Sequence, residues 1–496
     1  MSASAKSFLN GQCVSRSSIP VLAPQAFREE LVTGSQNGAR ICEMFALPDG
    51  PENKLIIALK VHDDLGRLTL ISTRVRNNSE FPSSSEYLPS VQAMERALYE
   101  DHGLKPLGHP WLKALRGHPD LSHAPSIPHP FLQAEGVGIH EVAVGPVHAG
   151  VIEPGHFRFQ CSGETVHTLE IHLGYQHRGA IAAILAADPK FRLAVVESLV
   201  GDGAVSHALA YTTIVEGLAG CSVPVRAKML RTVALEIERI SDHVGDFGAL
   251  CHDVGYLPGG SWCPRLRGDI QNALGVLTGH RFGRGYVVPG GVAVKIDYAA
   301  VRELDLILGN FEKEFLQVAS VALDVPSVLL RFEGTGTLST ADAKMLGILG
   351  PAARASGLDI DARRDLPPPG CSNANIDVAV FPYGDVLSRA RIRVEEIKHS
   401  IAAARGLLQE LPEGPQLAQC TGSTPNSVAV GIIEGSRGAT THIGVTGGDG
   451  ELVDYRVVEP SLLNWPGLAF AMRGQQISDF PLCNKSFDLS YAGHDL

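Results

Sequence analysis

Hydrophobic and polar residues alternate in short runs over the first part of the chain. Two runs rich in branched residues, Lys54–Val61 and Leu68–Val75, flank a turn-forming Asp-Asp-Leu-Gly segment, and this pattern predicts a β-hairpin. Apolar residues at helical spacing then predict a helix over Ser90–His102. Residues 1–117 are therefore expected to form a small α+β domain.

Prolines and histidines mark residues 118–130. Four prolines at this density are incompatible with a helix and favour an extended linker. The histidines His118, His123 and His129 raise the question of a metal site, but they lack the i,i+4 spacing of such sites. A solvated linker is the simpler interpretation.

Residues 131–496 are expected to form one large unit. Its most regular feature is an apolar stripe at three- and four-residue steps, which is typical of a helix in a bundle. The expected elements are strands at Gly138–Val144 and Phe157–Cys161, helices at Arg226–Leu250, from Ser339 onward and at Val386–Leu408, and a hairpin of His442–Val445 with Leu452–Val458. The predicted fold class is thus α+β, with a small N-terminal domain followed by a mainly helical bundle with peripheral strands.

Composition restricts the function classes. The chain has 496 residues with 42 Lys+Arg against 53 Asp+Glu, a net charge of −11 that argues against a nucleic-acid partner. No apolar stretch is long enough to span a bilayer. The N-terminal residues have no apolar core of a secretory signal. We therefore expect a cytoplasmic protein that reaches a membrane only through its partners.

The nine cysteines form no CxxC pair. Their odd number, in a chain without an export signal, favours reduced thiols over disulfides. Each is expected to be a small buried residue.

Four stretches of the large unit form a pattern in a fixed order. They are Val144-Gly-Pro-Val-His148 with Glu153–Arg158, His172–Gly179, Glu197–Tyr211 and the tail Asp479–Leu496. Together they resemble the large subunit of membrane-bound nickel–iron hydrogenases and its relative, the quinone-site subunit of respiratory complex I. Glu95–Gly103, followed by Gly108-His-Pro110, resembles the end of the small complex I subunit. This fused layout is similar to that of formate-hydrogenlyase-type large subunits.

In the hydrogenases that this chain resembles, two CxxC pairs supply four thiolates that hold nickel and iron. Here the first pair aligns with Val200 and Gly203, and the second with Ser490 and Gly493. Soft thiolate ligands three residues apart are what such a centre requires, and none of these side chains supplies one. The sequence therefore predicts no metal ligands and no nickel–iron centre, so the protein is not expected to be a hydrogenase itself.

In the complex I relative the corresponding cavity admits a quinone head group, bound by a His in a GPxH loop and by a Tyr. His148 matches the histidine of that loop, whereas the tyrosine position falls near Gly201. Tyr175, Tyr211 and Tyr491 are the alternatives for the missing donor. Quinone therefore stays a candidate ligand, and no other cofactor is expected.

Two further groups complete the candidate site. Glu197 precedes the first vacant pair by three residues, where the hydrogenase glutamate relays protons, and desolvation would raise its pKa. The alternative is an ion pair with Arg178 or Arg437. Asp202 either supports a turn or is a new functional group beside the empty site. Together with Arg437 and Ser490, it is a candidate for lining that site.

The resemblance implies a peripheral subunit on the cytoplasmic face of the cell membrane, within a complex I-like oxidoreductase. Its expected partners are an iron–sulfur small subunit and membrane-embedded complex I-like subunits. It would couple electron transfer, with quinone as a candidate acceptor, to ion translocation. A redox-silent coupling or assembly subunit is the alternative, and a metal enzyme with an unforeseen ligand set is the third hypothesis.

Overall fold

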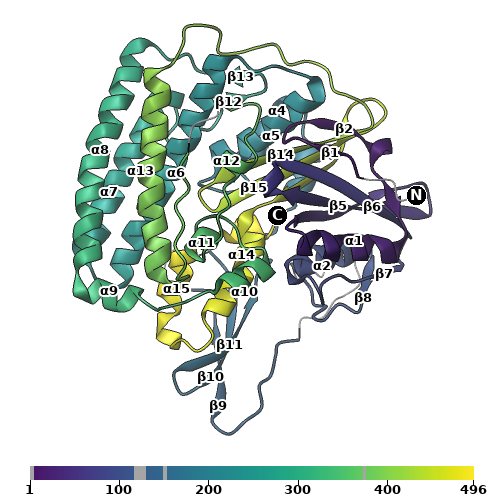
Figure 1. Cartoon of the computed structure of the whole chain (residues 1–496), viewed down its shortest axis with the longest axis horizontal. Helices are drawn as coiled ribbons and strands as arrows, with labels where there is room; N and C mark the ends of the chain where they lie inside the picture. Colours follow the sequence, from purple (N-terminus) through teal and green to yellow (C-terminus); the bar gives the residue numbers. More distant parts are fainter. Residues whose placement is uncertain (1–4, 117–129, 149–152, 372–375) are drawn as a thin grey trace.

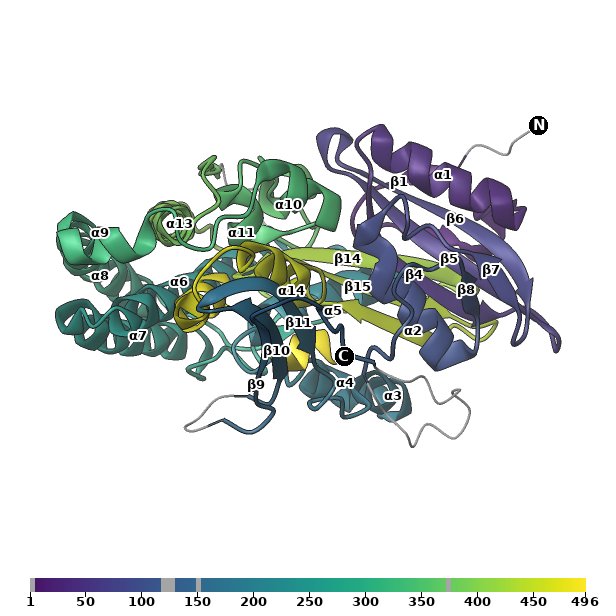
Figure 2. The same cartoon turned by 90° about the horizontal axis from the view of Figure 1, so that it is seen from below.

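The computed structural model describes residues 5–116, 130–148, 153–371 and 376–496. A helical bundle occupies one side of the molecule and a β-rich unit built from the N-terminal residues occupies the other (Figure 1). Between them lie the strands β14 and β15, as both views show (Figure 2). The mixed helix and strand architecture confirms the predicted α+β class. Most of the predicted linker falls outside the described residues.

The N-terminal unit is built on a five-stranded sheet. Its strands are β1 (Ser7–Phe8), β3 (Val21–Leu22), β4 (Arg40–Pro48), β5 (Asn53–His62) and β6 (Arg67–Arg76). The predicted hairpin is confirmed, because β5 and β6 pair antiparallel, with Ala58 opposite Ile71. Helices α1 (Pro24–Gln36) and α2 (Gln92–His102) belong to the same unit. The predicted helix from Ser90 is also confirmed, with its first turn in 3-10 form over Pro89–Val91.

Four long helices form the bundle on the left of Figure 1. They are α6 (Val225–Asp253), α7 (Leu257–Thr278), α8 (Tyr298–Asp324) and α13 (Val386–Gln409). The predicted helices at Arg226–Leu250 and Val386–Leu408 are thus confirmed. Asp385 caps α13 by accepting a hydrogen bond from the Ser388 N–H at 2.8 Å, which satisfies an otherwise unpaired donor.

A second sheet joins the two halves of the molecule. Its order is β16–β15–β14–β2, with strands β2 (Cys13–Ser15), β14 (Ser427–Gly435), β15 (Gly438–Thr446) and β16 (Leu452–Val458). The predicted C-terminal hairpin corresponds to β15 and β16, which pair antiparallel. Helix α5 (Ala204–Ala219) packs against β14. A Cβ on Gly431 would lie 2.3 Å from the Ala210 carbonyl oxygen, so only glycine permits this close approach.

A three-stranded sheet projects from the lower edge of the molecule (Figure 1). It consists of β9 (Ile139–Val144), β10 (His156–Ser162) and β11 (Thr165–His172), so the two strands predicted here are confirmed. Helix α14 (Pro460–Ala471) packs against β11.

Short elements complete the chain. The helices are α3 (Ala180–Ala186), α4 (Pro189–Val196), α9 (Pro326–Phe332), α10 (Thr340–Leu346), α11 (Gly350–Ala355), α12 (Ala362–Asp365), α15 (Phe480–Phe487) and α16 (Tyr491–His494). The remaining strands are β7 (Glu80–Pro82), β8 (Lys105–Leu107), β12 (Val287–Val288) and β13 (Gly291–Val292). The helix predicted from Ser339 is α10, and Ser339 caps it.

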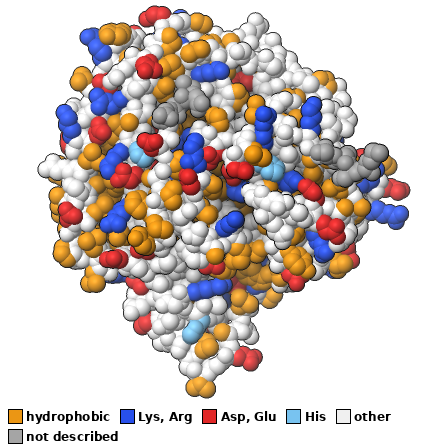
Figure 3. Space-filling model, in the orientation of Figure 1, with side chains coloured by type: hydrophobic (Ala, Val, Ile, Leu, Met, Phe, Trp, Pro, Cys, Tyr) orange, Lys and Arg blue, Asp and Glu red, His pale blue; other side chains and the backbone are white. Residues whose placement is uncertain are grey.

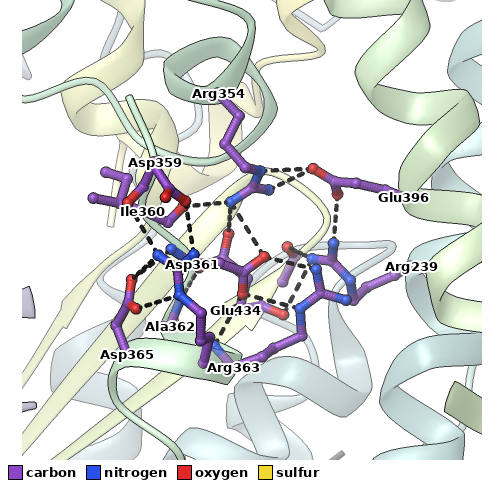
Figure 4. A network of polar contacts seen from close by, with 12 residues as sticks. Arg239, Arg354, Asp359, Ile360, Asp361, Ala362, Arg363, Asp365, Glu396 and Glu434 are labelled. Atoms are coloured by element: carbon purple, nitrogen blue, oxygen red, sulfur yellow. Dashed lines mark hydrogen bonds and ion pairs between the residues drawn. The ribbon is translucent and has the colours of Figure 1, made fainter. Parts of the chain in front are cut away.

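A buried network of arginines and carboxylates ties the bundle to β14 (Figure 4). Arg354 contacts Glu396 at 2.7 Å and Glu434 at 2.7 Å, and Arg239 pairs with Glu396 from another helix. These side chains come from α6, α11, α13 and β14, and all are at most 3% exposed. Charges that are buried in this way are stable only while each keeps its partners.

Among the described helices, none is long and apolar enough on its own to cross a membrane. Helices α8 and α9 meet the criteria of length and composition only as a pair, and that pair is bent by 77°.

Removing one carboxylate from this network should be costly. We expect Glu396→Ala to lower the free energy of unfolding by about 3–5 kcal/mol, because it leaves two arginines buried without their shared partner. Asp305→Ala breaks a half-exposed pair with Arg405 and should cost less than about 1 kcal/mol. Urea denaturation of both variants measures the difference. Equal losses would show that the network does not hold the fold.

Candidate functional site

One arginine brings together the two segments that align with the metal-binding pairs. Arg437 lies in the turn between β14 and β15. Its guanidinium donates to both carboxylate oxygens of Asp202, at 2.8 and 2.9 Å, and contacts the Asp488 carboxylate at 3.1 Å. Asp202 belongs to the loop before α5, and Asp488 follows α15. The loop after α4 and the C-terminal segment therefore meet at one guanidinium.

The four aligned positions lie around this junction. Val200 and Ser490 are 3% and 5% exposed. The Ser490 hydroxyl accepts a hydrogen bond from the Gly493 N–H at 2.9 Å and so caps α16. A Cβ on Gly493 would meet the Glu459 carboxylate at 2.5 Å, so a larger side chain does not fit there without a shift. None of these residues presents a thiol.

The junction is rich in buried carboxyl groups. Burial opposes ionisation of Asp202, but Arg437 outweighs it and lowers the pKa of Asp202 to about 2. Burial raises the pKa of Glu238 to about 8, although that carboxyl accepts hydrogen bonds from the backbone N–H groups of Val205 and Ser206. Asp242 also has a raised pKa, from burial and from its proximity to Asp202 and Glu238. Protonated and ionised carboxyls therefore sit side by side here.

Glu197 lies at the C-terminal end of α4 and is 5% exposed. Its carboxylate accepts a hydrogen bond from the Gly285 N–H at 2.8 Å. Burial raises the pKa of Glu197, and the hydrogen bond opposes that shift. Neither arginine considered from sequence pairs with it: Arg178 donates to backbone carbonyls, and Arg437 pairs with the two aspartates. Glu197 therefore keeps the features of a group that can exchange protons.

His148 and Tyr491 both lie next to Gly155. The His148 Nε2 atom is 3.1 Å from the Gly155 carbonyl oxygen. A Cβ on Gly155 would lie 2.6 Å from the Tyr491 ring, and the Phe157 ring lies 6.1 Å from His148 and 6.4 Å from Tyr491. Of the three tyrosines considered from sequence, Tyr491 is thus the one near His148.

The other candidates lie elsewhere. Tyr211 lies beside the Tyr455 ring, at 6.1 Å, and Tyr175 is 47% exposed next to His172. Gly201 is exposed, and a Cβ there would meet nothing within 4 Å. Among the residues proposed from sequence, the structure groups Asp202, Arg437 and Ser490 at the junction and places Gly201 at its surface.

Sequence reasoning missed a buried chain of polar rings that begins beside the junction. His207 Nδ1 lies 2.9 Å from His442 Nε2, and His442 Nδ1 lies 2.6 Å from the Tyr455 hydroxyl. Burial lowers the pKa of His207 to about 4, so this imidazole is neutral at physiological pH. The only sequence signal for this chain of rings is His207 itself, four residues after Gly203. Its partner His442 lies in β15, far away in the sequence.

The raised pKa of Glu238 predicts a pH effect on stability. Between its ordinary pKa and about 8 the folded state holds a proton that the unfolded state has lost, so this group makes stability fall as the pH rises through that window. In Glu238→Gln, the loss of Tm from about pH 5 to about pH 8 should be smaller than in the wild type. Glu86→Gln, at an exposed carboxyl, is the control. Parallel Tm profiles for Glu238→Gln and the wild type would contradict the prediction.

Comparison with known proteins places the chain in a family. The family model for the respiratory-chain NADH dehydrogenase 49 Kd subunit matches residues 253–427. Formate hydrogenlyase subunit 5 of Escherichia coli (strain K12) is 31% identical, over 84% of this chain and 77% of its own. The carbon monoxide-induced hydrogenase of Rhodospirillum rubrum is 30% identical, over 70% of this chain and 97% of its own.

A solved structure, that of an archaeal membrane-bound sulfane sulfur reductase, shares the fold. Its TM-score is 0.66 at 22% identity, with 72% of this chain and 99% of that chain covered. The sequence match to formate hydrogenlyase subunit 5 covers a larger share of the chain, 84%, than this structural match does. The chain is therefore a member of the family of membrane-bound hydrogenase subunits and 49 Kd complex I subunits to which formate hydrogenlyase subunit 5 belongs.

Proposed function

We propose that this chain is a peripheral subunit of a membrane-bound, complex I-like oxidoreductase that has no nickel–iron centre and couples electron transfer to ion translocation. The observation that carries the proposal is the ion pair of Arg437 with Asp202 and Asp488, at the junction of the two segments that align with the metal-binding pairs. The relatives belong to membrane-bound hydrogenase and complex I-like assemblies.

The donor set does not fit nickel and iron. The aligned positions carry a valine, two glycines and a serine, whereas such a centre needs soft anionic thiolates. A guanidinium, itself a cation, lies where the two segments meet and already uses the Asp202 carboxylate at 2.8 Å. The four aligned positions therefore offer a metal ion no thiolate ligand.

Quinone is the acceptor that the retained residues support best. Its reduction to a quinol consumes two electrons and two protons. The electrons would come from an iron–sulfur small subunit, which we propose as the partner on one side. His148 and Tyr491, which both lie next to Gly155, carry groups that can hydrogen-bond such a head group or supply protons to it. Glu197, buried and with a raised pKa, would then restore protons to the site.

We further propose that the subunit lies on the cytoplasmic face of the membrane and rests on membrane-embedded complex I-like subunits. No nucleic-acid partner is expected, given the net charge of −11. A shift of protons among Asp202, Glu238 and Asp242 would change the charge next to Arg437. That change is how the subunit could signal to its membrane partners.

A redox-silent coupling or assembly subunit is the alternative, and one observation favours it. Arg437 contacts Asp202 at 2.8 Å and Asp488 at 3.1 Å, so an ion pair joins the two segments that align with the metal-binding pairs. In that case the carboxyl groups would exchange protons while no acceptor binds.

Metal analysis tests the first part of the proposal. We expect the purified complex to contain far less than one nickel per copy of this chain, because no thiolate pair is present to bind it. Inductively coupled plasma mass spectrometry measures the content. One nickel per chain would contradict the proposal and favour an unforeseen ligand set.

Binding of a quinone analogue separates the two remaining functions. In the assembled complex we expect saturable binding that His148→Ala weakens about tenfold or more, since the substitution removes a hydrogen-bonding group from the site. His167→Ala, at an exposed position on β11, is the matched control and should bind like the wild type. Wild-type complex that binds no analogue would support the redox-silent alternative.

A further inference from the structure

A cavity of about 370 Å³ lies between the N-terminal unit and the large unit. Its walls come from α2, β11 and α14, and from the chain that follows β8. Most of the lining side chains are apolar, and they include Trp111, Leu169, Trp465 and Phe470. Figure 3 shows hydrophobic side chains gathered below the centre of this face, over the region where Figure 1 draws α14 and α10 beside α2. A volume of this size accommodates a small organic molecule.

Two arginines reach this apolar space, and neither forms an ion pair with any described residue. Arg96 is 7% exposed, and its guanidinium donates to the carbonyl oxygens of Lys113 and Ala114, at 2.8 and 2.6 Å, and to the side chain of Gln92 at 3.1 Å. Arg473 stacks on Phe470, with 3.8 Å between its guanidinium carbon and the ring centroid.

The acceptors around Arg96 are all neutral, which is unusual for a buried charge. Burial lowers its pKa to about 10, so the group is still a cation at neutral pH. Glu100 and Glu170 act on it only from a greater distance, and Glu170 is engaged by Lys113 at 2.6 Å. The cavity therefore combines apolar walls with a positive charge that lacks a counter-ion in contact.

The cavity also shares a wall with the candidate site. The Trp465 indole N–H donates to the Ser490 carbonyl oxygen at 3.3 Å, and the Trp465 ring lies 5.0 Å from that of Tyr491. His494 lines both this cavity and a neighbouring one of about 340 Å³. A molecule in the cavity would thus touch the residues that hold the C-terminal segment in place.

We propose that this cavity binds a small amphiphilic anion, which is a molecule with an apolar ring system or short chain and one acidic group. The apolar part lies against Trp111 and Trp465, and the acidic group faces Arg96 and Arg473. The proposal goes beyond the function proposed above, because the site is lined by the interface of the two units and does not include His148.

The test uses the full-length chain and two fluorescent probes of similar shape. The first is 8-anilinonaphthalene-1-sulfonate, an anion, and the second is N-phenyl-1-naphthylamine, which is neutral. We expect both to bind at one saturable site. Ala469→Trp, which fills the cavity from α14, should weaken both about tenfold or more. Arg473→Gln and Arg96→Gln should weaken the anion several-fold and leave the neutral probe nearly unchanged.

Arg302→Gln is the matched control, since Arg302 also stacks on an aromatic ring, that of Tyr298 at 5.1 Å, but lies outside the cavity. It should change neither probe. If Ala469→Trp bound both probes as tightly as the wild type does, the proposal that the probes bind in this cavity would be wrong. Arg473 is exposed, so it can be replaced without disturbing the core. If Arg473→Gln weakened the binding of both probes equally, the proposal that the site prefers an anionic ligand would be wrong. His148→Ala should leave both probes bound, so this test is independent of the acceptor site.

Discussion

The contact of Arg437 with Asp202 and Asp488 is the interaction on which the arrangement of the site depends. Without the guanidinium, two half-buried acidic side chains from distant parts of the chain would lie close together with no counter-ion between them. The turn that carries Arg437 is itself fixed by Arg239, which donates hydrogen bonds to the Glu434 and Gly435 carbonyl oxygens. The buried network of the bundle and the ion pair of the site therefore form one continuous polar structure. A change in charge at the ion pair can therefore alter the strength of the hydrogen bonds in the network, and the reverse also holds.

Much of the fold could be predicted because its elements carry local periodicity. Helix α6 shows an apolar stripe in which Leu230, Val233 and Ile237 are fully buried, and the hairpin of β5 and β6 has branched residues around a clear turn. Strand β14 was not predicted. All nine of its residues are buried, so the alternation that marks a half-exposed strand is absent. Only the surrounding sheet and α5 define it.

The sequence predicted those residues of the site that belong to local motifs. Glu197, His148 and the two vacant pairs follow from local sequence, but the partner of Asp202 is 235 residues away and no local pattern links the two. The hydrogen bond between His207 and His442 has the same separation. Such pairs arise from the packing of α5 against β14 and β15, which only the folded chain provides.

Strand β2 has a consequence for how the protein is made. Its neighbour Asn10 donates to the Ile432 carbonyl oxygen, 422 residues later in the chain, and β2 itself pairs with the start of β14. At a translation rate of about 5–20 residues per second, the N-terminal segment waits roughly 20–80 seconds for its partner strand. During that interval the backbone of residues 13–15 lacks the strand with which it pairs in the folded protein. The second sheet can therefore close only after β14, β15 and β16 have been synthesised, so the two ends of its strand order belong to opposite ends of the synthesis schedule.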